Sequence, residues 1–469
     1  MTAAIITLIR NMGDFMANIA YFKHGCNPTL GHANFDRLVR AGNHTEVDLH
    51  EIVETENFGK LKDLDYIVLD FCASSGDNYE YSLKEIEAVY DKLTTYGVKC
   101  LVVGCITRLP LALERLTKSC PDLIIIDSRD WLNDTHNHLT NSSEEFDIES
   151  QCVSRSNYPY ISNVNGEAVA PKIEFNIAKG CNNNCTFCKT NFVKDSRIVS
   201  LPFNVVLNYL KDTVKINGVR EISLLGDNLT QYCVDTDGKP RIHELLNELE
   251  KIPEVVSIYV SELTFQDMYS ELLQELIRNK KVKFTTLQIE MASDNLLKLM
   301  NRKHTVKQAD EILAELRHNR DLKIMTFLMS GFPTETEADV LATIEFIKRN
   351  DLVFGVAQTY QHSPLLKFVD TLEHLPIEEQ ERHLLMLNEF GLEHNTKLFR
   401  KYARNIKQAL ILQKYQDVTL CSTGTDGFLA TTGEVDDSYK AGDIVDVEDV
   451  RVIPPETQAY EVSFGLKIC

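Results

Sequence analysis

The sequence predicts an α/β protein in which parallel strands alternate with helices. From Lys172 onward, short apolar runs that end at glycine or polar residues alternate with amphipathic stretches, which is the pattern of successive βα units. The first third of the chain repeats this pattern on a smaller scale. With 469 residues, 43% of them hydrophobic, the chain is long enough for two or three domains.

In the first third, each of three predicted strands is followed by a cysteine, at Cys26, Cys72 and Cys105. The carboxyl ends of parallel strands open onto one crevice, so these cysteines are able to meet and form a three-Cys site. Free cysteine is also a common core residue, and the wide spacing carries no local motif, so both interpretations stay open. The predicted strands are 17–22, 65–70 and 99–103, with a helix over 82–93 and the end of an open parallel sheet near 123–126.

A Cys-x3-Cys-x2-Cys triplet in the middle of the chain is its most informative motif. It consists of Cys181, Cys185 and Cys188. Three thiolates can hold three irons of a 4Fe–4S cluster and leave the fourth iron open, whereas an electron-transfer cluster normally has four Cys ligands. Structural zinc usually takes four Cys or His ligands from two paired knuckles, and no second knuckle lies nearby. An iron–sulfur site is therefore favoured over zinc.

The triplet lies on the loop after a predicted strand, and five further strands follow. Six βα units predict an open, partial (β/α)6 barrel of the TIM type, whose chemistry gathers at the carboxyl ends of the strands. The triplet, the 226–228 turn and the 331–333 turn all fall at such ends. Thr334 and Glu337 predict a capping box that opens the next helix. The predicted strands are 172–178, 220–225, 255–260, 282–289, 323–329 and 352–357, and the predicted helices are one from Pro202, then 268–277, 309–316 and 338–348.

Composition limits the class of protein. Twelve cysteines are too few for a disulfide scaffold of this size and indicate a reducing compartment. Neither a signal peptide nor an apolar run of membrane-spanning length is found, so we expect a cytoplasmic protein without a membrane span. The remaining cysteines are predicted to be ordinary thiols: Cys100, Cys120, Cys152, Cys233, Cys421 and Cys469.

Three parts of the chain together resemble the radical S-adenosylmethionine (SAM) methylthiotransferases. The quoted segments are His-Gly-Cys26-Asn, Cys72 after Ile-Val-Leu-Asp-Phe, Val-Val-Gly-Cys105, Gly-Cys-Asn-Asn-Asn-Cys-Thr-Phe-Cys188 and Gly-Phe-Pro-Thr-Glu-Thr336, while 407–469 looks like the small C-terminal β-barrel called the TRAM domain. The resemblance implies an N-terminal methylthiotransferase domain over 15–145 with an auxiliary cluster, a linker over 146–170, a radical SAM core over 171–400 and a TRAM-like β-barrel over 405–469.

The resemblance also implies a mechanism that uses two 4Fe–4S clusters and two SAM molecules. One SAM methylates sulfur held at the Cys26/Cys72/Cys105 cluster. The other is cleaved at the triplet cluster by an electron from a flavodoxin- or ferredoxin-type donor, and its 5′-deoxyadenosyl radical abstracts hydrogen from an unactivated carbon. The family's cofactor contacts carry over to Phe187, Gly226 and Asn228. No catalytic acid or base is evident.

One position departs from the family pattern beside these contacts. The family usually has Pro-Val-Gln-Ser-Gly-Ser where this chain has Gln288-Ile-Glu-Met-Ala-Ser293, so Glu290 brings a possible charge next to the cofactor or substrate. Phe327 also stands where the family often has Asp, and Leu365 where it has Arg, so the substrate-facing residues differ while the cofactor-holding residues are kept. This predicts a divergent branch of the family with an unusual substrate.

Charge favours a protein or peptide substrate over transfer RNA. The formal net charge is −20, and from Gln408 to Cys469 there are four Lys or Arg against eleven Asp or Glu. An acidic domain repels a polynucleotide and attracts a basic polypeptide. Modification of a transfer RNA adenosine remains the alternative, since a local basic groove is compatible with a negative total. A third interpretation is an iron–sulfur binding protein that has lost its chemistry.

Overall fold

The computed structural model describes most of the chain in separate stretches. The described residues are 19–24, 44–46, 52, 57–71, 78–126, 162–164, 167–169, 172–193, 196–319, 322–360, 362, 366–402, 405–414, 419–422, 429–432, 438–439, 443–448 and 451–452. None of the helices found in these stretches is long and apolar enough to cross a membrane.

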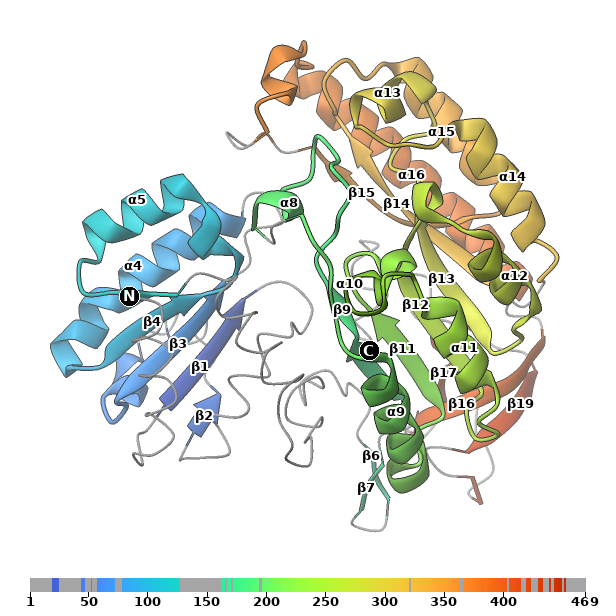
Figure 1. Cartoon of the computed structure of the whole chain (residues 1–469), viewed down its shortest axis with the longest axis horizontal. Coiled ribbons are helices and arrows are strands. Elements are labelled where there is room, and N and C mark those ends of the chain that lie inside the picture. Colours follow the sequence, from blue (N-terminus) through green and yellow to red (C-terminus); the bar gives the residue numbers. More distant parts are fainter. Residues whose placement is uncertain are drawn as a thin grey trace.

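Five parallel strands form the N-terminal sheet in the order β2-β1-β3-β4-β5 (Figure 1). Helices α4 (Asn78–Tyr96) and α5 (Pro110–Ser119) pack on this sheet, and side chains of β3, β4 and both helices share one buried apolar cluster. The predicted open parallel sheet is confirmed, with strand ends shifted by up to two residues. The strands are β1 Ile19–His24, β2 His44–Glu46, β3 Tyr66–Phe71, β4 Lys99–Val103 and β5 Ile124–Ile125.

Six parallel strands form the central sheet in the order β15-β14-β13-β12-β11-β8, so β8 and β15 lie at its two edges. This is the predicted partial (β/α)6 barrel, and all six of its strands were predicted to within four residues. β11 is buried along its whole length, as expected of a strand inside a parallel sheet. The strands are β8 Lys172–Asn176, β11 Glu221–Leu225, β12 Ser257–Thr264, β13 Val282–Gln288, β14 Lys323–Ser330 and β15 Val353–Thr359.

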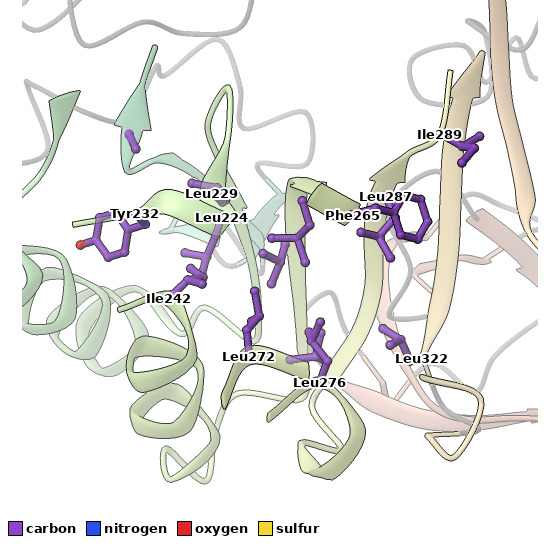
Figure 2. Close-up of a cluster of buried hydrophobic side chains, with 14 of the residues drawn as sticks. Leu224, Leu229, Tyr232, Ile242, Phe265, Leu272, Leu276, Leu287, Ile289 and Leu322 are labelled. Atoms are coloured by element: carbon purple, nitrogen blue, oxygen red, sulfur yellow. The ribbon is translucent and has the colours of Figure 1, made fainter. Parts of the chain in front are cut away.

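Helices cover the outer face of this sheet and form its core with the strands. Leu245, Leu246 and Leu249 of α11 and Leu272 and Leu276 of α12 are fully buried, at the spacing of one helix face. Figure 2 shows side chains of these helices and of β11 and β13 gathered in that layer. The main helices are α9 Phe203–Asn217, α11 Ile242–Glu250, α12 Ser270–Arg278, α13 Asp294–Leu299, α14 Val306–Leu316, α15 Glu337–Arg349 and α16 Ile377–Tyr402.

The long helix α16 covers the edge strand β15. Asn395 of α16 donates to the carbonyl oxygen of Phe354 at 2.7 Å and accepts from the Phe354 amide at 3.0 Å. A Cβ on Gly391 would lie 2.3 Å from the Phe354 ring, so glycine lets the helix approach the strand closely. An exposed sheet edge invites pairing with other chains, and this helix protects it.

Two smaller β-structures complete the described fold. An antiparallel hairpin, β6 (Ser162–Val164) with β7 (Glu167–Val169), lies within the stretch predicted as a linker. The C-terminal strands form an antiparallel sheet in the order β19-β16-β17-β18-β20, the secondary structure expected of a small β-barrel. These strands are β16 Asn405–Lys414, β17 Thr419–Ser422, β18 Leu429–Thr432, β19 Ile444–Glu448 and β20 Arg451–Val452.

The predicted capping box at Thr334 and Glu337 is wrong. Helix α15 begins two residues later than that pattern requires, and its capping box is formed by Thr336 and Asp339. Thr334 instead has a φ of 70°, and its amide donates to the carbonyl oxygen of Glu373 at 2.9 Å. A β-branched residue rarely adopts this left-handed conformation, which costs about 1–3 kcal/mol.

We expect Thr334→Gly to raise the free energy of unfolding by about 1 kcal/mol. The change removes the backbone strain and a buried hydroxyl that has no hydrogen-bond partner among the described residues, and the added freedom of glycine in the unfolded chain offsets part of the gain. Thermal unfolding of the two proteins measures the difference. The matched control is Thr336→Gly, which removes the helix cap at an ordinary φ and should lower stability by a few tenths of a kcal/mol. Destabilisation by Thr334→Gly would contradict the strain.

Candidate functional site

The cysteine loop leaves the barrel through Gly180, at a position that only glycine fits. Gly180 follows the short strand β9 (Ala178–Lys179) with a φ of 86°, and a Cβ there would lie 2.0 Å from the carbonyl oxygen of Arg197. The Gly180 amide donates a 2.6 Å hydrogen bond to Oδ2 of Asp227, just beyond β11. The start of the loop is therefore fixed to the end of the neighbouring strand.

The three cysteines of the loop are free thiols with different exposure. Cys185 is buried, while Cys181 and Cys188 are half-buried. Burial raises the pKa of Cys181 to about 11 and that of Cys185 to about 12, although the nearby Arg302 cation opposes the shift at Cys185. These two thiols are thus protonated at neutral pH in the metal-free chain, and a bound metal must displace their protons.

The donor set fits an iron–sulfur cube better than a single ion. A structural zinc ion takes four Cys or His ligands, whereas this loop supplies three cysteines. A cube needs its thiolates on three different irons, and a loop with three spaced thiols supplies this. Two groups donate to Sγ of Cys181: the backbone amide of Asn183 at 3.4 Å and Nδ2 of Asn228 at 3.7 Å. Hydrogen bonds to ligand sulfur help to set the properties of a cluster.

A half-buried aspartate ties the cysteine loop to two strand ends. Asp267 lies just after β12, and its Oδ2 accepts hydrogen bonds from Nδ2 of Asn183 at 2.7 Å, Nδ2 of Asn228 at 2.9 Å and Oγ1 of Thr264 at 2.7 Å. Asn228 itself is only 1% exposed, and its Oδ1 has no hydrogen-bond partner in the described part of the chain. A buried acceptor beside the Cys181 sulfur is thus available to a bound molecule.

The other side of the loop is held by the turn after α13. Thr186 donates through Oγ1 to the carbonyl oxygen of Leu299 at 2.8 Å and through its amide to that of Met300 at 3.1 Å. Asn301 donates through Nδ2 to the carbonyl oxygen of Asn184 at 2.6 Å. The loop is thereby anchored on both sides before any ligand binds.

An ion pair lies beside the anchored loop. Arg302 and Glu290 form a salt bridge whose side chains are 6% and 13% exposed. The guanidinium of Arg302 lies 5.5 Å from the centre of the Phe187 ring, within cation–π range. Phe187 separates Cys185 from Cys188 in sequence, so this pair is next to the ligands themselves.

A second carboxylate enters the barrel from β12. Glu262 has a φ of 50°, and its Oε2 accepts from Nε2 of Gln288 at 3.0 Å, while Oε1 of Gln288 accepts from the Phe327 amide at 3.1 Å. Desolvation raises the pKa of Glu262 to about 7; the Gln288 hydrogen bond opposes this rise, and the negative charges of Asp227 and Glu290 add to it. Glu262, Asp227 and Glu290 therefore lie close enough together at the carboxyl ends of the strands to influence one another's charge.

The structure brings most of the predicted site residues together. Phe187, Asn228 and Glu290 lie around the triplet as described above. Gly226 also lies there: a Cβ on it would meet Leu229 at 2.5 Å, and its amide donates to Oγ of Ser261 at 3.2 Å. Whether these residues contact SAM stays a prediction.

The predicted second site is described only in part. Cys26 and Cys72 lie outside the described residues. Cys105 begins a 3-10 helix, η2 (Cys105–Arg108), directly after β4, and the backbone there places it at the carboxyl end of the N-terminal sheet. Nη2 of Arg108 donates to the carbonyl oxygen of Phe192 at 3.2 Å. Phe192 belongs to α8 (Thr190–Val193), which follows Cys188 and lies beside the N-terminal domain in Figure 1.

Three residues of the site were missed by sequence reasoning: Asp267, Arg302 and Glu262. None of the three belongs to a motif singled out in the sequence: Glu262 stands between Ser261 and Leu263, and Asp267 between Gln266 and Met268. Apart from Thr264, which is three residues from Asp267, their hydrogen-bond partners named above are 12 to 84 residues away in sequence. The available signal was their place at or just beyond predicted strand or helix ends.

Comparison with known proteins finds a family model and related sequences that match this chain. A family model described as the Radical SAM superfamily matches residues 175–347. Ribosomal protein uS12 methylthiotransferase RimO of Clostridium botulinum (strain Eklund 17B) is 28% identical over 349 residues, 72% of this chain and 76% of that protein. The tRNA-2-methylthio-N(6)-dimethylallyladenosine synthase of Pelagibacter ubique is 29% identical over 216 residues, 45% of this chain and 48% of that protein.

A solved structure shares the fold. The radical SAM methyltransferase TsrM of Kitasatospora setae, with tryptophan and a SAM analogue bound, superimposes with a TM-score of 0.51. The likeness covers 74% of this chain and 73% of that one at 9% sequence identity. At that identity the match concerns the arrangement of strands and helices, not the chemistry.

Proposed function

We propose that the chain, as a divergent member of the radical SAM methylthiotransferase family, replaces hydrogen by a methylthio group on an unactivated carbon of a protein or peptide. Methylthio modification is what the relatives that it matches are named for. The proposal adds the substrate class, the second cluster and the residues that hold the cofactors.

One observation carries the two-cluster part of this proposal. Arg108, three residues after Cys105, bonds the backbone of Phe192, four residues after Cys188, at 3.2 Å. The segment that carries one predicted cluster ligand is therefore in direct contact with the segment that follows the triplet. Transfer of sulfur to a substrate radical requires both centres near one substrate carbon, because a carbon radical must be quenched before it reacts elsewhere. The contact between the two segments supports the proximity of the two centres that the reaction requires.

The residues of the chain have defined tasks in the proposed reaction. Cys181, Cys185 and Cys188 would hold a 4Fe–4S cluster, which would supply the electron for the reductive cleavage of SAM. Gly180 and Asp267 hold the cysteine loop rigid through the bonds described above. Asn228 offers its buried Oδ1 as an acceptor for an ammonium or hydroxyl donor of the bound molecule. Cys26, Cys72 and Cys105 would hold the auxiliary cluster.

The atoms of the proposed reaction balance as follows. The hydrogen atom of the substrate C–H bond goes to 5′-deoxyadenosine, and a methylthio group takes its place on carbon. The SAM that is cleaved leaves as methionine and 5′-deoxyadenosine. The methyl group would come from the second SAM, which leaves as S-adenosylhomocysteine. The sulfur would come from the auxiliary centre, which would also accept the electron released when methylthiolate joins the carbon radical. A donor of the flavodoxin or ferredoxin type supplies the electron for SAM cleavage.

Charge supports a polypeptide rather than transfer RNA as substrate. The chain carries −20 overall, and its last 62 residues carry −7. This excess of acidic residues gives the chain a negative electrostatic field at neutral pH. A polyanion loses affinity at such a surface, whereas lysine- or arginine-containing segments gain it. A transfer RNA substrate, the alternative, has in its favour the likeness to the adenosine-modifying relative.

The substrate class is tested by mass spectrometry of cells with and without the protein. We expect a gain of one methylthio group on a protein or peptide and no change in transfer RNA nucleosides. A methylthio adenosine that depends on the protein would replace the proposal by its alternative. If reduced, cluster-loaded protein formed neither 5′-deoxyadenosine nor S-adenosylhomocysteine from SAM, methylthio transfer itself would be excluded.

We expect Cys105→Ala to separate the two half-reactions. The variant should still form 5′-deoxyadenosine at the triplet, but methylthio transfer should fall at least about a hundredfold and about half of the iron should be lost. Cys100→Ala is the matched control. Cys100 is a buried thiol of β4, the strand directly before Cys105, and is not a predicted cluster ligand. Full methylthio transfer by Cys105→Ala would remove the auxiliary cluster from the proposal.

A further inference from the structure

The Arg302–Glu290 ion pair sits where a charge acts strongly on the cysteine loop. Arg302 is held beside the loop because it directly follows the turn formed by Leu299, Met300 and Asn301, which binds Thr186 and Asn184 through three hydrogen bonds. Its guanidinium is nearly fully buried, next to the Phe187 ring. A guanidinium keeps its charge at every physiological pH. A fixed positive charge therefore lies close to Cys185 and Cys188 with little water to screen it.

Glu290 is built into the barrel so that it meets this charge. Its backbone has a φ of 63°, an uncommon conformation for a residue with a side chain. Its carbonyl oxygen accepts from the Met329 amide at 3.2 Å, and it forms an isolated parallel bridge with Leu328 of β14. The backbone of Glu290 is thus fixed by the neighbouring strand, and its carboxylate reaches the guanidinium of Arg302. Glu290 also stands where the family usually has an uncharged glutamine.

We propose that Glu290 is a positioning residue that neutralises Arg302 beside the cysteine loop and thereby keeps the reduction potential of the bound cluster low. The inference rests on the proposed function, since it concerns the cluster at Cys181, Cys185 and Cys188. The physical reason is that an uncompensated cation stabilises the reduced, more negative cluster and so makes it a weaker reductant. SAM cleavage needs a strong reductant, and a paired Arg302 can anchor the loop without weakening it.

The test is a redox titration of the full, cluster-loaded chain without oxygen, followed by electron paramagnetic resonance. The signal that changes when SAM is added identifies the triplet cluster. We expect Glu290→Gln to shift its midpoint potential to a more positive value, and Glu290→Asp, which keeps the charge, to retain the wild-type value. The double variant Glu290→Gln with Arg302→Gln should return close to wild type, because both charges are gone. Glu275→Gln is the matched control, since it removes the buried partner of another ion pair, with Arg278 at 2.7 Å on α12.

The outcomes separate this inference from the proposed function. If Glu290 had a purely structural role, Glu290→Gln and Glu290→Asp would both change cluster loading or stability. Neither would then show a shift in midpoint potential that the double variant reverses. The inference is overturned if Glu290→Gln leaves the midpoint potential of the cluster unchanged, or if Glu290→Gln and Glu275→Gln shift it equally. In either case the proposed function still stands, provided that the wild-type protein cleaves SAM. A wild-type protein that takes up no cluster at the triplet overturns both.

Discussion

Replacement of Cys185 by alanine is expected to lower 5′-deoxyadenosine formation at least about a thousandfold. The cluster supplies the electron that cleaves SAM, and the variant lacks one of the three cysteines that would hold this cluster. Cys185 is the most buried of the triplet and lies between the two anchors of the loop, so no other described thiol can take its place. The measurement is anaerobic reconstitution, with iron and sulfide content, followed by detection of 5′-deoxyadenosine after addition of SAM and a reductant.

The control for this variant is Cys233→Ala. Cys233 is a fully buried free thiol of the same barrel, and the change from cysteine to alanine leaves its left-handed φ of 72° equally strained. This control should keep its cluster and its activity with a modest loss of stability, of about 1 kcal/mol for the small cavity. If Cys185→Ala kept both cluster and SAM cleavage, the triplet would not be the site of the chemistry.

Sequence alone identified the cysteine loop because its information is local. Three cysteines within eight residues, a preceding apolar strand and a glycine break are all visible in one short stretch. The same holds for the barrel strands, whose apolar runs end at polar residues. Parallel order then implied that the strand ends meet at one edge, and the structure confirms this.

The remaining parts of the site depend on contacts between residues that are far apart in the sequence. Asp267 binds Asn183 across 84 residues of sequence, and Thr186 binds Leu299 across 113. A single Asp or Thr outside a recognised motif has no pattern of its own, so its partner cannot be predicted from sequence spacing. The capping box fails for a related reason: Thr334 with Glu337 and Thr336 with Asp339 are locally equivalent, and the contact of Thr334 with Glu373 decides between them.

Replacement of Glu262 by glutamine is expected to stabilise the metal-free chain by about 2 kcal/mol at pH 8 and by much less near pH 5. Desolvation raises the pKa of Glu262 from 4.5 to about 7, with Asp227 and Glu290 adding to the rise against the Gln288 hydrogen bond. Between these values the native chain holds a proton that the unfolded chain has released, so the free energy of unfolding falls as pH increases. Above about pH 7 the penalty is complete, and glutamine avoids it while still accepting a hydrogen bond from Gln288.

Unfolding midpoints of both proteins at several pH values measure this effect, and Glu244→Gln supplies a control of opposite sign. The hydrogen bond from Arg241 lowers the pKa of Glu244, so its carboxylate contributes stability above its ordinary pKa and loses it in acid. Glu244→Gln should therefore be less stable than wild type at pH 8, by less than about 1 kcal/mol because the pair is partly exposed to solvent. A constant advantage of Glu262→Gln at every pH would show that packing, not charge, is responsible. If Glu262→Gln were less stable than wild type at pH 8, the Glu262 carboxylate would have a partner whose interaction offsets the cost of its burial.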